Sequence, residues 1–413
     1  MQALKGKISI DKLSSLFFRM AAMASKFVIF TFLSKYFDTE TYGIYSLQAT
    51  TITIAIFILG FDFYNFAIRD ILIEKKETAS KVFTAFVLYG ATYILFSGIG
   101  YAIFERIDYF ASYTWLLLAI GITEHFNQEL YRLLLALKKV WIANCLLFIR
   151  VAGWSLYILF KILILIETIT ISDVLMTWMI FNVGTIIFTG IIFGKTILEH
   201  GSKIGFNSAW LKKGLKISMV FYAATIFLKI IEYSNRYIVE AVLDEAAAGI
   251  FSFYSNFSMV MGIYVSTIVV SYELPALIES STNHTFLEKL QRYKKLLMLH
   301  SVIAAGIVLA CIYPILLWQD KTEFMVYWPL LVLLTLGMFL INISLLYHSY
   351  LYIKHKEKKL LEIVMISGIF NVLATFILCY FYGLYGAAIA FLLTAIVLYA
   401  LRRNAVKRKE LVL

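Results

Sequence analysis

Five cationic side chains lie in stretches of sequence that are otherwise apolar enough to cross a membrane: Arg19, Lys26, Arg150, Lys229 and Arg236. A charge at the centre of a bilayer costs roughly 2.5 to 3.5 kcal/mol on insertion scales, so such residues usually face a bundle interior or a water-filled cavity. There they pair with a neighbour or serve a ligand. Because cations are in excess here, the pattern predicts an anionic ligand.

The spacing of these charges places several on shared helix faces. Arg19 and Lys26 are seven residues apart and project from nearly the same face, since two turns almost close the circle. Lys229, Glu232 and Arg236 follow at i, i+3 and i+7, again on one face. Glu232 can neutralise both neighbours without any ligand. The sequence therefore leaves two roles open for Lys229, Glu232 and Arg236: local ion pairing and ligand binding.

Two oppositely charged residues lie in the middle of successive predicted helices. Glu124 belongs to the fourth and Arg150 to the fifth, so we expect an ion pair between the helices, with structural and functional roles both open. Glu124 is also the candidate for proton or sodium coupling, because desolvation makes a buried carboxylate readily protonated. His125 points about 100° around the helix from Glu124 and is predicted to be a packed or interfacial histidine.

Four charged residues lie near predicted helix ends. Glu129 and Arg132 are three residues apart, and we expect them to pair along their own helix. Asp62 precedes Arg69 by two turns. The two could act as a gate on the cytoplasmic side, and a turn that faces the membrane interface is the alternative. Asp62, Glu124 and Glu232 are thus the candidate coupling or gating residues.

The composition predicts a membrane protein. Hydrophobic residues make up 61% of the 413-residue chain and charged residues 15%, and the mean hydropathy is +0.83. Windows of about 20 apolar residues predict spanning helices. We expect twelve, near residues 13–34, 43–66, 82–104, 113–135, 141–163, 171–194, 214–240, 249–272, 296–318, 325–350, 361–381 and 384–401. The fold class is therefore an all-α integral membrane protein.

Every second loop between these spans is rich in basic residues, which places most of them on one side of the membrane. One side receives most of them, including Lys5, Lys7, Lys12, Lys75, Lys76, Lys81, Lys138, Lys139, Lys203, Lys212, Lys213, Lys294, Lys295, Lys358, Lys359, Arg402, Arg403, Lys407, Arg408 and Lys409. The opposite side has only Lys35, Arg106, Lys161 and Lys321. Because cytoplasmic loops carry the excess of Lys and Arg, both termini are predicted to be cytoplasmic. Topology and anionic headgroups explain the net charge of +11 without a nucleic-acid partner.

An internal repeat divides the chain in half. Residues 38–46, DTETYGIYS, match residues 244–252, DEAAAGIFS, at a shift of 206 residues (38 to 244). Each half would begin in the cytoplasm and contain six spans, so the two lobes, residues 1–200 and 201–413, are related by an axis along the membrane normal. Parallel repeats of this kind build transporters with a midplane substrate site.

The chain resembles the polysaccharide transporters of the multidrug/oligosaccharidyl-lipid/polysaccharide (MOP) superfamily, particularly bacterial O-antigen flippases. The likeness spans nearly the whole chain and rests on Tyr42–Ser46, on Gly60, Asp62 and Arg69, on Gly249–Ser252 and on Tyr382–Ala390. It implies a MATE-like, V-shaped pair of six-helix lobes. It also implies a cavity whose cations receive the pyrophosphate of an undecaprenyl-linked oligosaccharide, in the bacterial inner membrane.

Three classes of function remain open. A flippase accounts for the buried cations, because a pyrophosphate leaving water needs cations that replace its hydration. A cation-coupled multidrug exporter of the same superfamily is the alternative, although surplus cations disfavour cationic drugs. A membrane glycosyltransferase, ligase or polymerase is disfavoured, since the outer loops are short and no catalytic or metal-binding constellation appears. We expect no cofactor beyond a proton or sodium gradient, anionic lipids as partners, and contact with polysaccharide polymerase machinery.

Overall fold

A computed structural model describes residues 10–74, 77–199, 205–281 and 284–406 of the chain. Within these ranges every regular element is a helix. The α-helices are α1 (Ile10–Tyr36), α2 (Thr39–Ile58), α3 (Tyr64–Glu74), α4 (Thr78–Phe104), α5 (Asp108–Ala111), α6 (Thr114–Ala136), α7 (Val140–Leu163), α8 (Ile171–Glu199), α9 (Ser208–Val242), α10 (Glu245–Val265), α11 (Ser271–Glu279), α12 (Phe286–Gln319), α13 (Thr322–Val326), α14 (Pro329–Ile353) and α15 (Glu357–Ala405). A π-helix, Ser266–Val270, joins α10 to α11.

Ten helices of the described ranges are long and apolar enough to span a membrane. The expected twelve differ from these ten at two places, α15 and α6. Helix α15 contains a kink at Gly383, whose φ of 57° and ψ of −141° are not helical, so its 49 residues form two spans. Helix α6, the predicted fourth span, has 23 residues but is not among the ten, and it carries Glu124, Asn127 and Glu129.

The predicted second span was too long. Residues 43–66 were expected to form one helix, whereas α2 ends at Ile58 and α3 begins at Tyr64. Phe61 and Asp62 between them both have positive φ, 49° and 50°. Non-glycine residues rarely adopt this left-handed conformation, which reverses the chain and makes α3 a separate short helix.

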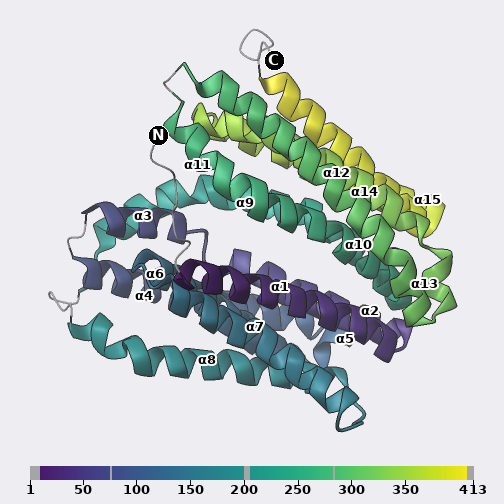
Figure 1. Ribbon diagram of the computed structural model, residues 1–413. Coiled ribbons are helices and arrows are strands. Elements are labelled where there is room, and N and C mark those ends of the chain that lie inside the picture. Colours follow the sequence, from purple (N-terminus) through teal and green to yellow (C-terminus); the bar gives the residue numbers. More distant parts are fainter. Residues whose placement is uncertain (1–9, 75–76, 200–204, 282–283, 407–413) are drawn as a thin grey trace. The chain divides into compact units, whose positions relative to one another are not determined.

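The chain divides into two compact units. Unit 1 comprises Met1–Phe32 and Gln48–Met219, and unit 2 comprises Leu33–Leu47 and Val220–Leu413. In unit 1, α6 packs against α4, α7 and α8, and in unit 2, α14 packs against α10, α12 and α15. Figure 1 shows unit 1 mainly in purple to teal and unit 2 mainly in green to yellow. The lobe boundary expected at residues 200 and 201 stays a prediction.

Apolar side chains form the interior of each unit and also much of its surface. In unit 2, Leu290, Tyr293 and Leu297 of α12 pack with Leu346 and Tyr350 of α14. Large apolar residues on the outside of the helices include Ile94 of α4, which is 80% exposed, Ile180, Ile191, Phe376 and Cys311. Outward apolar faces of this extent are expected where lipid is the solvent. Cys311 lies on such a face.

The repeated motif has the same local structure in both halves. Asp38 Oδ1 accepts a hydrogen bond of 2.8 Å from the amide of Thr41 at the start of α2. Asp244 Oδ1 accepts one of 2.6 Å from the amide of Ala247 at the start of α10. An aspartate at this place caps the free amides of the first helical turn. The Thr41 bond is the main reason why the pKa of Asp38 lies below its usual range.

The two motifs also contact each other inside unit 2. A Cβ on Gly43 would lie 1.8 Å from the carbonyl oxygen of Glu245, and a Cβ on Gly249 would lie 2.7 Å from that of Thr39. Thr39 and Glu245 occupy the same place in the repeat, and so do Gly43 and Gly249. The crossing of α2 and α10 is therefore reciprocal, and each glycine permits the close approach of the other backbone.

Two of the four basic residues predicted on the outer side bind backbone carbonyls at the ends of α1 and α12. Lys321 Nζ donates to the carbonyl oxygen of Ser34 at 2.9 Å and also to that of Phe37. Lys35 donates to the carbonyl of Trp318 and lies over its ring, 4.6 Å from the centroid. Because the last carbonyls of a helix have no intrahelical partner, these lysines have structural roles in unit 2.

The start of α9 is anchored in unit 1. Trp210 Nε1 donates to Asp70 Oδ2 at 2.8 Å, and Lys81 Nζ lies 2.6 Å from the same oxygen. Gly214 faces the rings of Phe63 and Phe66, which its Cβ would approach to 2.5 Å and 2.4 Å. These contacts attach the segment that leads into the second half of the chain to α3 and α4.

Removing the carboxylate of this anchor should make stability respond less to acid. Burial raises the pKa of Asp70, but hydrogen bonds from Lys81 and Trp210 outweigh burial, so the pKa lies below its usual range. A depressed folded-state pKa stabilises the fold above the unfolded value of about 3.9, and this contribution is lost as the pH falls through the folded value. We expect Asp70→Asn to have a lower melting temperature than the wild type at neutral pH. The difference in melting temperature should shrink below about pH 4.

The measurement is the melting temperature of both proteins in detergent across this pH range. The exposed Asp108 provides the control, Asp108→Asn. A margin for Asp70→Asn that stays constant in acid would contradict a stabilising carboxylate at this position.

Candidate functional site

The two cations of α1 differ in exposure. Arg19 is exposed, and Lys26, two turns further along the helix, is half-buried. Both belong to the part of α1 that is assigned to unit 1. Between Phe17 and Tyr36 this helix contains no carboxylate. The half-buried position of Lys26 within a span makes it the stronger candidate for ligand contact.

The ladder on α9 combines one ion pair with a second, deeper cation. Lys229 Nζ lies 2.6 Å from Glu232 Oε2, three residues along the same helix. Arg236 is only 2% exposed and donates through Nη2 to Asn256 Oδ1 of α10 at 2.7 Å. Its guanidinium also lies 5.5 Å from the ring centroid of Tyr233. The local ion pair is present for Lys229, and Arg236 lies two turns further along the same face.

The expected pair between the fourth and fifth spans is present. Arg150 Nη1 lies 3.3 Å from Glu124 Oε2, and both residues are 5% exposed. Arg150 also donates to the Glu124 carbonyl at 3.2 Å and to Gln128 Oε1 at 3.3 Å. Trp178 Nε1 of α8 donates to Glu124 Oε1 at 2.6 Å and stacks on Trp154. Both carboxylate oxygens of Glu124 are thus engaged by groups of unit 1.

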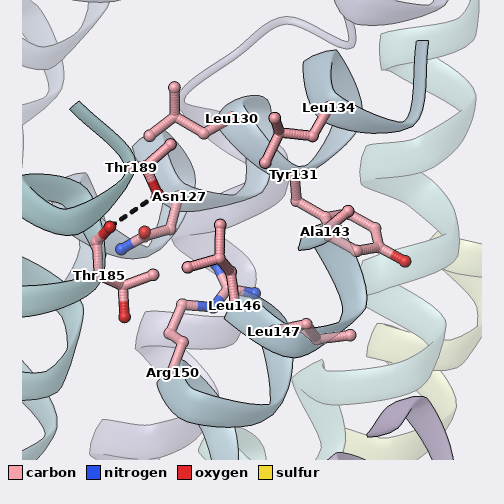
Figure 2. Close-up of a pocket in the computed structure, with 10 residues that line it drawn as sticks. All are labelled: Asn127, Leu130, Tyr131, Leu134, Ala143, Leu146, Leu147, Arg150, Thr185 and Thr189. Carbon is pink, nitrogen blue, oxygen red and sulfur yellow. Dashed lines mark hydrogen bonds between the residues drawn. The ribbon is translucent and has the colours of Figure 1, made fainter. Parts of the chain in front are cut away.

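A small pocket lies beside Arg150, among α6, α7 and α8. Figure 2 shows its ten lining residues, with the Arg150 side chain beside Leu146 and with Asn127 and the threonines on the opposite wall. Arg150 Nε has no hydrogen-bond partner among the described residues. The pocket leaves about 10 Å³ for the centre of a water molecule, close to the room that one buried water needs. It is too small for a sugar or a phosphate.

A second polar cluster in unit 1 surrounds Glu129. The predicted pair with Arg132 is present, and Tyr89 of α4 donates to Glu129 Oε2 at 2.7 Å. His125 is fully buried, as expected for a packed histidine, and Tyr93 lies 2.7 Å from its Nδ1. The cluster as a whole was not predicted. Two pairs of polar residues four positions apart in the sequence could have indicated this cluster: Tyr89 with Tyr93, and His125 with Glu129.

The remaining sequence candidate, Asp62, lies in the turn between α2 and α3. Asp62 is 6% exposed, close enough for its charge to act on Glu129 and Tyr64. Arg69, expected to act with it, is exposed on α3. Asp62 therefore belongs to the surroundings of the Glu129 cluster.

Two buried cations were assigned wrongly to loops from the sequence, Lys81 of α4 and Arg402 of α15. Arg402 was counted among the cytoplasmic loop residues, whereas it lies in the last turn of α15 and is 2% exposed. Its Nη1 donates to Ser344 Oγ of α14 at 2.6 Å. Within the described ranges, no three His, Cys, Asp or Glu side chains come together as a metal site.

Known families and curated proteins give no match to this sequence. Solved structures do. Lipid II flippase MurJ in an inward closed conformation aligns at a TM-score of 0.73 and 15% identity, over 97% of this chain and 89% of MurJ. An inward-facing multidrug resistance MATE family transporter aligns at 0.67 and 12% identity, over 96% of this chain and 93% of its own.

A third solved structure is a MOP superfamily transporter from Pyrococcus furiosus, described as having a binding pocket of reverse polarity. It aligns at a TM-score of 0.59 and 12% identity, over 96% of this chain and 94% of its own. At such identities the likeness establishes the fold, over nearly the full length of both partners. This chain is a multi-pass membrane protein with the fold that MATE transporters and the flippase MurJ share, the MOP transporter fold.

Proposed function

We propose that this protein is a flippase that moves undecaprenyl-pyrophosphate-linked oligosaccharides from the cytoplasmic to the outer leaflet of the bacterial inner membrane. The observation that carries the proposal is the placement of cations within helices that can span the membrane, Lys26 on α1 and Arg236 on α9. Lys26 is half-buried in a helix segment without carboxylates, and Arg236 is buried beside a neutral amide. Cations in these places are suited to a pyrophosphate that leaves water.

The candidate contacts for the pyrophosphate are Arg19, Lys26, Lys229 and Arg236. Arg150 is the weakest of the five cations first considered, because Glu124 and Gln128 already engage its guanidinium. The lipid tail would stay in the hydrocarbon of the bilayer while the cations bind the headgroup. Alternating access, with one lobe rocking against the other, is the mechanism that parallel repeats support.

The proposed orientation places both termini in the cytoplasm, following the alternation of basic loops. The terminal residues lie outside the described ranges, and so do Lys75, Lys76 and Lys203. Anionic lipids would contact the basic loops on this side. A polysaccharide polymerase would receive the glycan on the other side, in the manner of O-antigen or a related surface polysaccharide.

Mass spectrometry of lipids from cells that lack the protein, compared with cells in which it is restored, tests this function. We expect a complete undecaprenyl-pyrophosphate oligosaccharide to accumulate in the deletion and to disappear on restoration. Lipids that stay unchanged would reject the flippase. Accumulation of an incomplete unit would instead indicate a glycosyltransferase.

Replacing Lys26 by alanine should reduce transport without reducing the amount of folded protein. A lysine that offers a point charge to a phosphate loses this interaction on truncation, whereas Lys26→Arg keeps the charge. Complementation of the deletion, with membrane levels measured in parallel, compares the two variants. Full activity of Lys26→Ala would show that the cation on α1 is not a ligand contact.

A cation-coupled multidrug exporter is the second candidate. It is favoured by the similarity to MATE transporters and by the three carboxylates buried in unit 1, Asp62, Glu124 and Glu129. Altered drug sensitivity of the deletion strain, with unchanged glycolipids, would select the exporter.

A further inference from the structure

The transport proposal leaves one buried pair of titratable groups on α6 without a role. His125 is 0% exposed and Glu129 is 7% exposed. Four residues apart, they face each other with His125 Nε2 3.8 Å from Glu129 Oε1. This distance is too long for a hydrogen bond, and Nε2 has no hydrogen-bond partner among the described residues. A buried ring nitrogen thus lies open beside a carboxylate oxygen.

Neighbouring groups hold the other polar atoms of the pair. Tyr93 engages His125 Nδ1 at 2.7 Å, and Tyr89 donates to Glu129 Oε2 at 2.7 Å. The guanidinium of Arg132 pairs with Oε1 from the side. The gap between Oε1 and Nε2 is consequently the place where one added proton would complete a hydrogen bond. When Nδ1 carries the ring proton and donates to Tyr93, Nε2 is an acceptor, and an added proton on Oε1 can be donated to it.

A pocket connects Glu129 with the surface of unit 1. Residues of α3, α4 and α6 line it, and it leaves about 40 Å³ for the centres of water molecules. Ile71 and Val82 at one end are half-exposed, whereas Tyr89 and Glu129 at the other are buried. In the proposed orientation the exposed end is cytoplasmic. Water in this pocket would give protons a route to the carboxylate.

Charges of both signs surround the pair. Asp62, buried in the turn before α3, brings a negative charge near Glu129. Arg132 brings a positive charge, and its guanidinium is held over the ring of Tyr64, 3.4 Å from the centroid. Gly60 faces the imidazole so closely that a Cβ there would lie 2.3 Å from Nε2. Because Gly60 has no side chain, the imidazole ring of His125 has room beside Glu129.

We propose that Glu129 and His125 bind one proton between Oε1 and Nε2, and that this proton is exchanged with the cytoplasm during transport. It passes from water in the pocket to Glu129, is held by His125, and returns by the same path. The coupling role rests on the proposed transport function, whereas proton binding does not. Glu124, the carboxylate first considered for coupling, does not line this pocket.

Infrared difference spectroscopy of the purified full-length protein, titrated with acid, tests proton binding directly. A protonated carboxylic acid has a carbonyl band that a carboxylate lacks. We expect a band that titrates in the wild type, is lost in Glu129→Gln, persists in Glu124→Gln and shifts in frequency and midpoint pH in His125→Gln. A band lost in Glu124→Gln instead, or the absence of any titrating buried carboxyl group, would overturn the proposal.

Proteoliposomes test the coupling. The probe is a fluorescent short-chain polyprenyl-pyrophosphate glycolipid, whose flipping is measured with the cytoplasmic side of the protein at neutral pH and at acidic pH. We expect acidification of this side to accelerate flipping by the wild type and by Glu105→Gln, an exposed glutamate at the end of α4. Glu129→Gln and His125→Gln should lose this acceleration. Variants that retain it would refute coupling at this pair. If the wild type does not flip the probe, the proposed function fails, while the infrared result stands by itself.

Discussion

Gly43→Ala should cost the protein at least about 3 kcal/mol of stability, a large effect for one methyl group. The added Cβ would lie 1.8 Å from the carbonyl oxygen of Glu245 and 3.2 Å from the amide nitrogen of Gly249. Both atoms are backbone, so no side chain can rotate away and the helices must separate. Capping and apolar packing along this crossing of α2 and α10 would be disturbed together.

Thermal unfolding followed by size-exclusion chromatography in detergent measures the effect. Gly249→Ala should behave like Gly43→Ala, because its Cβ meets the carbonyl of Thr39 at 2.7 Å. Gly184 and Gly306 offer matched controls in spanning helices, since a Cβ at either meets nothing within 4 Å. Equal melting temperatures for Gly43→Ala and Gly306→Ala would be incompatible with the tight crossing.

Glu124→Gln is expected to destabilise unit 1 by about 3–5 kcal/mol, because it leaves the buried guanidinium of Arg150 without its counter-charge. Trp178 would also lose the charge that its indole N–H binds at 2.6 Å. The double variant Glu124→Gln/Arg150→Met should recover most of the loss, since replacing both members of a buried ion pair is often nearly neutral.

A double-mutant cycle that includes Arg150→Met alone gives the coupling energy. Denaturant titration of the purified proteins, monitored by tryptophan fluorescence, is a suitable readout because Trp154 and Trp178 stack at 5.0 Å within this cluster. Simple additivity of the two single losses would mean that the ion pair contributes nothing of its own. Transport by a stable double variant would then separate the structural from the functional role of Glu124.

The sequence was sufficient for those features that depend on local pattern. Apolar windows located the spans, and opposite charges in the middle of successive helices predicted the pair of Glu124 and Arg150. The repeat was visible because the motif is short and spaced by half the chain. Its aspartates cap helices, and its glycines lie in one crossing. Local chemistry thus accounts for most of the fold.

Features that depend on helix rotation or on contacts between helices could not be predicted. Arg402 and Arg403 are adjacent at the end of an apolar run, and only a rotation of about 100° decides that Arg402 points inward. The break after α2 requires two non-glycine residues of positive φ, Phe61 and Asp62, which composition does not signal. The polar cluster around Glu129 depends on the register of α4 against α6, which neither helix reveals alone.

The reciprocal contact between Gly43 and Gly249 has a consequence for the ancestry of the chain. Equivalent positions touch each other, which is the geometry of an isologous interface between two identical subunits. A half-length ancestor could have made the same crossing as a symmetric dimer, with a single glycine codon serving both sides. After duplication and fusion, the two glycines had separate codons but remained in one contact. A larger side chain at either position would then require a compensating change at the other.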